Sequence, residues 1–122
     1  MSFIVKKSDE PRVVKSWPVV VPTAEDGGKI RKDEIFVDYE VIKHSEVEDM
    51  QREATRAGES LDGMILDRTV RSINGLVDEQ NSPVPFNPET FADAKDCSSL
   101  RQAMVASFYD VLAGRKPARK NS

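Results

Sequence analysis

Residues 30–42, Ile-Arg-Lys-Asp-Glu-Ile-Phe-Val-Asp-Tyr-Glu-Val-Ile, decide the fold because they carry the clearest period in the chain. Apolar side chains at 35, 37, 39 and 41 alternate with the residues at 34, 36, 38 and 40, of which all but Phe36 are acidic. Successive side chains of a β-strand point to opposite faces, so this alternation predicts a strand with one buried face and one solvent-facing side.

A second strand is predicted immediately upstream. Residues 12–21, Arg-Val-Val-Lys-Ser-Trp-Pro-Val-Val-Val, are rich in β-branched side chains, which favour strands. Pro18 cannot donate to a hydrogen-bond ladder, so this strand is expected to be an edge or to carry a bulge. Gly27 and Gly28 supply the positive φ angles that a tight turn needs. Residues 12–42 are therefore expected to form one long antiparallel hairpin.

Downstream of this hairpin the apolar period changes from two to 3.6, which predicts helices. Two capping boxes, Ser45 with Glu48 and Ser99 with Gln102, mark expected helix starts. Glycines after the last periodic residue mark the expected ends of these two helices. The expected helices span about 45–57, 60–73, 88–96 and 99–113.

The start of the third expected helix has the most complete local signal. Asn87 is a good N-cap, and Pro88 suits the first helical position. Phe86 lies just before the helix and Phe91 just inside it, the arrangement of a hydrophobic staple. This helix is therefore expected to enter the fold at a fixed angle.

The predicted fold class is α+β, with an N-terminal antiparallel β-hairpin packed on about four α-helices, mainly helical. Residues 1–11 are expected to be a flexible lead-in, residues 12–114 a single domain, and residues 115–122 a basic flexible tail.

The composition restricts the class of protein. The chain has 122 residues, a formal net charge of −3 and a single cysteine, so no intramolecular disulfide can form. No apolar run approaches the roughly 20 residues that span a bilayer. We therefore expect a soluble intracellular protein with no membrane contact. Nucleic acid is an unlikely partner by this criterion, because its binders usually carry a positive balance and a basic face.

No set of residues in the sequence assembles a catalytic site. His44 is the only histidine, and Cys97 has no cationic neighbour in sequence. General acid–base or nucleophilic catalysis needs a second group to activate the first. Acidic clusters such as Glu46, Glu48 and Asp49 lack the spacing of a calcium loop and are typical of a solvated face. We expect the protein to bind another protein, to have no enzymatic activity and to hold no cofactor or metal.

Two segments are candidate partner-binding surfaces. Three consecutive valines, at 19–21, cannot all face the core of one hairpin. This suggests that another copy covers the strand edge, and it predicts self-association. The basic tail is the other candidate. The predicted partner-binding residues are Trp17, Val19, Val21, Arg115, Lys116, Arg119 and Lys120.

Residues 73–89 read Ile-Asn-Gly-Leu-Val-Asp-Glu-Gln-Asn-Ser-Pro-Val-Pro-Phe-Asn-Pro-Glu. This segment resembles the tail assembly chaperones of long-tailed, siphovirus-type bacteriophages. In that family a helix is followed by a Gly-Val/Leu-Asp-Glu stretch and then by a Pro-hydrophobic-Pro-Phe-Ser/Asn motif that opens the next helix. Ile73 stands where the family often has tryptophan, and Ser82 where it usually has glycine. The residues that carry the motif here are Asp78, Pro83, Pro85, Phe86 and Phe91.

The resemblance implies a function in tail morphogenesis. It implies that the chain binds and solubilises the phage tape-measure protein and helps to recruit tail-tube subunits. It also implies that the protein acts in the host bacterial cytoplasm and is absent from the mature virion. Members of this family are often made in two lengths by ribosomal slippage, and a slippery run at the codons of Lys120 and Asn121 would give such a longer product.

Two other classes of protein remain open at this point. The first is a small regulatory or antitoxin-like module that uses the hairpin or the basic tail on DNA. The second is a structural phage adaptor that stays in the particle. Salt-dependent DNA binding would favour the regulator, and presence in purified virions would favour the adaptor.

Overall fold

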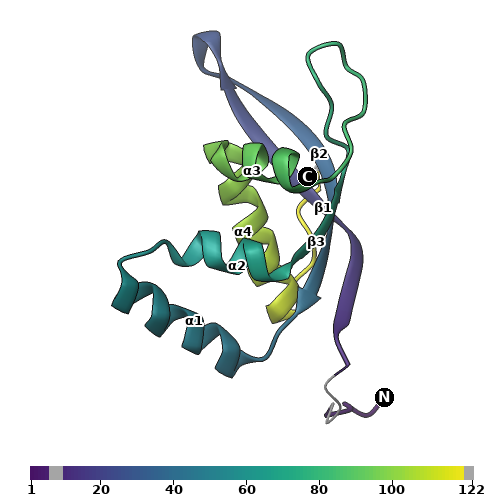
Figure 1. The fold of residues 1–122 in the computed structure, drawn as a ribbon. Helices are drawn as coiled ribbons and strands as arrows, with labels where there is room; N and C mark the ends of the chain where they lie inside the picture. Colours follow the sequence, from purple (N-terminus) through teal and green to yellow (C-terminus); the bar gives the residue numbers. More distant parts are fainter. Residues whose placement is uncertain (6–9, 120–122) are drawn as a thin grey trace.

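The computed structural model describes residues 1–5 and 10–119, which form a three-stranded antiparallel sheet and four α-helices (Figure 1). The strands, in the sheet order β1-β2-β3, are β1 (Arg12–Glu25), β2 (Lys29–Val41) and β3 (Val70–Asn74). The helices are α1 (His44–Ala57), α2 (Leu61–Thr69), α3 (Pro88–Asp96) and α4 (Ser98–Ala113). The α+β class is thus confirmed, with strand content that makes the fold less helical than expected.

The predicted hairpin is present. Strands β1 and β2 join through a short 3₁₀ turn in which Gly27 and Gly28 have φ angles of 75° and 81°. The prediction that Pro18 belongs to an edge strand is confirmed, because β2 is the one strand within residues 1–5 and 10–119 that pairs with β1. A bulge interrupts the pairing between Val14 and Trp17. It accommodates the positive φ of Ser16, whose N–H donates to Asp38 Oδ1 at 2.8 Å.

Strand β3 corrects the prediction of a helix over residues 60–73. Helix α2 ends at Thr69, and residues 70–74 pair with β2, with Val37 opposite Ile73 and Phe36 opposite Asn74. Val70 and Ile73 both lie in the core, so their spacing continues the helical pattern of Ile65 and Leu66 while the backbone is extended. The free edge of β2 provides ladder hydrogen bonds, and this tertiary pairing overrides the local preference.

Two of the predicted helix starts are also corrected. Helix α1 begins at His44, and α4 begins at Ser98, so Ser45 and Ser99 lie inside the helices and cap neither. The carbonyl groups of the preceding residues already accept the first helical hydrogen bonds, at 3.3 Å from Val47 to residue 43 and at 2.8 Å from Arg101 to residue 97. The expected helix ends are confirmed, because Gly58 and Gly114 both adopt the left-handed conformation.

The core lies between the sheet and the helices on one of its faces (Figure 1). Its centre is the apolar row of β2, in which Val37 and Tyr39 are fully buried. The Tyr39 ring lies 5.8 Å from the Phe108 ring of α4, and its hydroxyl donates to the Met104 carbonyl at 2.9 Å. This hydrogen bond satisfies the one polar atom of a large buried side chain and fixes α4 against the middle strand.

An ion-pair network closes the core at the end of β2. Glu40 is buried, and its carboxylate pairs with Arg71 of β3 and, at 2.5 Å, with Arg68 of α2. Arg68 also pairs with Glu46 of α1 at 2.5 Å. A buried carboxylate is costly unless it is paired, so this network specifies how α1, α2 and β3 meet.

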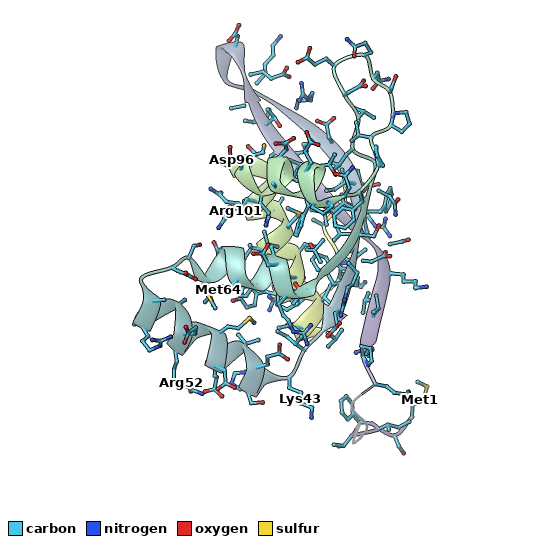
Figure 2. The ribbon with its side chains drawn as sticks, in the orientation of Figure 1. Met1, Lys43, Arg52, Met64, Asp96 and Arg101 are labelled. Atoms are coloured by element: carbon cyan, nitrogen blue, oxygen red, sulfur yellow. The ribbon has the colours of Figure 1, made fainter. Side chains whose placement is uncertain are left out.

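Arg101 ties α4 to the rest of the helical layer. Its guanidinium donates to Ser60 Oγ at 3.1 Å and to the Lys95 carbonyl at 3.2 Å, and it lies on the same side of the molecule as Asp96 and Met64 (Figure 2). Gly63 leaves room for it, since a Cβ there would stand 3.0 Å from Arg101 Nη2. Helix α1 packs mainly on α2, and Arg52 lies on its outer side (Figure 2).

Substitution of Tyr39 by phenylalanine tests the central contact through its pH dependence. Burial raises the pKa of Tyr39 above its ordinary value of about 10, so its contribution to stability is present below that pH and lost as the pH rises. Tyr39→Phe is expected to cost about 1 kcal/mol at neutral pH through the lost hydrogen bond.

Above pH 10 the wild-type free energy of unfolding should fall more steeply than that of Tyr39→Phe, by up to about 1.4 kcal/mol per pH unit, so the two curves converge. Denaturant unfolding at a series of pH values measures this. Tyr109→Phe is the matched control, because Tyr109 is only half-buried, and it should remove less of the slope. Parallel stability curves for wild type and Tyr39→Phe would contradict the raised pKa of the buried Tyr39 hydroxyl.

Candidate partner-binding surfaces

The structure corrects the surface role predicted for two of the β1 valines. Val19 and Val21 are 2% and 8% exposed, and both belong to the core. Val20 alternates with them along the strand and is half-buried. Trp17 is also half-buried and packs against the core, and its buried indole N–H has no hydrogen-bond partner among the described residues. The outward-facing part of this segment is therefore its backbone edge, and the side chains of Val19 and Val21 are structural.

A pocket of about 340 Å³ lies between β1 and α4. It is lined by residues that include Pro18 and Val20 from the strand, Ala103 and Ala106 from the helix, and Ala118 from the C-terminal segment. The structure thus brings together the two predicted binding segments, strand and tail. Two prolines, at positions 18 and 22, limit the donors available along this edge. Self-association through this edge stays a prediction.

The basic tail begins with a defined contact. Arg115 Nε donates to Asp110 Oδ1 at 2.8 Å, and the Arg115 N–H donates to the Asp110 carbonyl at 2.9 Å. Lys116 and Arg119 are exposed. Lys120 and Asn121, where the slippage site is expected, lie outside the described residues. So do residues 6–9 of the expected lead-in.

The loop between β3 and α3 is ordered by one side chain. Asp78 Oδ1 accepts hydrogen bonds from the backbone N–H groups of Gln80 and Ser82, each at 2.9 Å. Val77 forms a β-bridge with Pro83, and further backbone bonds close the loop on itself. The motif residues Asp78 and Pro83 therefore shape this loop, which projects beyond the helices beside the β1–β2 turn (Figure 1).

The second half of the motif fixes the start of α3. The predicted cap is confirmed, since Asn87 Oδ1 accepts from the Thr90 N–H at 2.9 Å and Thr90 Oγ1 accepts in return from the Asn87 N–H at 2.9 Å. Thr90 Oγ1 also donates to the Pro85 carbonyl at 2.8 Å. The predicted staple is confirmed as well, with the Phe86 and Phe91 ring centroids 5.4 Å apart.

Between this loop and α3 lies an open groove of about 640 Å³, which we call the loop–α3 groove. Its floor is apolar, and its rim is polar except for Val77. The floor consists of Leu76, Val84, Ala94 and Leu100, and the rim consists of Val77, Asp78, Glu79, Gln80, Thr90, Asp93 and Cys97.

The rim of the loop–α3 groove carries only negative charge. Asp78, Glu79 and Asp93 line it, and its lining includes no lysine, arginine or histidine. Within residues 1–5 and 10–119, Glu79 and Asp93 have no ion-pair partner. Val77 is 52% exposed, so a large apolar side chain of the same rim stands in solvent.

The residues considered for catalysis lie apart from one another. The His44 side chain is 87% exposed, with Nε2 3.5 Å from Glu48 Oε1 at the start of α1. Cys97 is exposed at the junction of α3 and α4. Among the described residues, no group of three or more histidine, cysteine or acidic side chains is placed to hold a metal ion.

Sequence reasoning missed the loop–α3 groove because its walls come from separate elements. The sequence did mark Asp78 and the two phenylalanines as a motif, yet Val77, Glu79 and Asp93 carry no local signal of a shared surface. Val77, an apolar residue beside an acidic pair in a predicted loop, is the one position that could have drawn attention.

Comparison with known proteins adds no relative. No protein-family model, curated protein or solved structure matches this chain. In the part of the chain that the structure describes, no helix has the length and apolar character needed to cross a membrane.

Replacement of Phe91 by alanine tests whether the staple supports this site. Phe91 is half-buried and contacts both Phe86 and Lys95. We expect Phe91→Ala to lower the free energy of unfolding by about 2 kcal/mol, less than for a fully buried ring. Ile30, 55% exposed near the β1–β2 turn, is the control, and Ile30→Ala should change stability by less than about 0.5 kcal/mol. Equal effects in denaturant unfolding would rule out the staple as a stabilising contact.

Proposed function

We propose that this protein is a phage tail assembly chaperone, which binds and solubilises the tape-measure protein and helps to recruit tail-tube subunits in the host cytoplasm. The observation that carries the proposal is the motif segment, residues 73–89, whose sequence resembles that family. The same segment forms the loop wall of the loop–α3 groove, and its Asn87 and Phe86 help to fix the start of α3, the opposite wall. The residues of the resemblance are thus the residues that shape an open apolar surface.

The physical character of the groove supports this proposal. A tape-measure protein is a long, helical and poorly soluble chain, so its chaperone must cover apolar surface along a rod. Many copies with weak, reversible contacts suit this task, because many contacts along one client together give a high overall binding strength. An apolar floor within an acidic rim provides such a contact, and the net charge of −3 keeps the coated client soluble.

Co-expression tests the proposed function directly. The client is the product of the longest helical reading frame next to the gene, produced in bacteria with and without this protein. We expect the client to be insoluble alone, and to be soluble and to co-purify with this protein when both are present. Co-expression with Glu59→Lys, a substitution of an exposed residue outside the groove, should solubilise the client equally well.

A client that stays insoluble in the presence of this protein would overturn the proposal. Salt-dependent binding of the purified protein to DNA would favour the regulatory module instead, and recovery of the protein from purified virions would favour the structural adaptor.

A further inference from the structure

The loop–α3 groove offers side chains rather than backbone to a partner. Within the loop, the Asp78 N–H donates to the Ser82 carbonyl and the Val84 N–H donates to the Leu76 carbonyl, at 2.9 and 3.0 Å. On the opposite wall the backbone belongs to α3 and is bonded within the helix. Neither wall therefore presents an open ladder edge on which an extended peptide could add a strand. A partner must bring a segment whose own backbone is already hydrogen-bonded.

An α-helix meets that requirement, because its backbone groups bond to each other and only its side chains project. Its apolar stripe would enter the floor of the groove formed by Leu76, Val84 and Leu100. Thr90 and Asp93 lie three residues apart on one face of α3, and Cys97 follows at its end, so this side of the groove forms a wall along which a second helix can lie.

The charges of the rim specify the flanks of such a helix. Glu79 from the loop and Asp93 from α3 both line the groove, and no cation among its described lining residues neutralises them. Val77 belongs to the same lining and is exposed. A helix with lysine or arginine on both sides of its apolar stripe would place each cation near one of these carboxylates.

We propose that the loop–α3 groove binds an amphipathic α-helix that has an apolar stripe flanked by basic residues. This inference rests in part on the proposed function, since it names the face that would take the helices of the tape-measure protein. Residues 115–119 of the basic tail do not occupy the groove, because none of them lines it and Ala118 lines the separate pocket between β1 and α4.

Cys97 allows the test to be made at the groove itself. It is the only cysteine of the chain, it is exposed, and it lines the loop–α3 groove. The probe is a synthetic helix of leucine and lysine, about 18 residues or roughly five turns long. The rate at which the neutral reagent N-ethylmaleimide modifies Cys97 is measured at increasing concentrations of this peptide, and peptide binding is followed separately by fluorescence anisotropy.

We expect the bound peptide to slow modification by about tenfold, because a docked helix covers the thiol. A leucine–glutamate peptide of the same pattern should give no protection. In the double variant Glu79→Lys, Asp93→Lys, the peptide concentration for half-protection should rise by about tenfold or more. The control variant Asp26→Lys, Glu59→Lys makes the same change in net charge at exposed positions outside the groove and should behave as wild type.

Three results would overturn the inference. The first is an unchanged modification rate when anisotropy shows saturated binding. The second is an equal loss of protection in the groove and control variants. The third is protection that depends on protein concentration without peptide, which would assign the groove to a second copy of the chain. None of these results decides whether the protein solubilises a tape-measure client, so the two proposals fail separately.

Discussion

The contact between the middle strand and α4 is the constraint on which the rest of the structure depends. Among the described strands, β2 alone has neighbours on both sides, so its buried row, centred on Tyr39, lies beneath the helical layer. The hydrogen bond from Tyr39 to the Met104 carbonyl sets the position of α4 along this row. Because α3 runs directly into α4, the same contact places the wall of the loop–α3 groove.

The other wall depends on the opposite edge of the sheet. β3 pairs with β2 and releases the chain at Asn74, and Asp78 then folds the following loop on itself. The Glu40 network joins β2, β3 and α2 at the far end of the same strand, which limits how β3 can shift. Loop and helix thus reach the groove from two independent anchors on the sheet. A groove built in this way is largely preformed, which lowers the entropy cost of binding.

The sequence predicted those parts of the fold that depend on local patterns. The alternation around Val37 predicted the hairpin, and Asn87 with Pro88 predicted the start of α3 at the observed residue. It failed where a distant partner decides the conformation, as at Val70 and Ile73, whose spacing suits a helix but whose backbone pairs with β2. The prediction of the binding surface failed for the same reason. Val19 stands in a run of three valines that cannot all face one core, yet its side chain is buried in the fold. The groove arises only when the loop and α3 meet.

The central proposal is that a helical client binds in the groove between the loop and α3. The most direct measurement is hydrogen–deuterium exchange of this protein alone and in complex with the co-expressed client. We expect slower exchange in residues 76–84 and 90–97 upon binding, with little change in α1, which packs on α2. Protection confined to α1 or to the open edge of β1, with unchanged exchange around the groove, would contradict it.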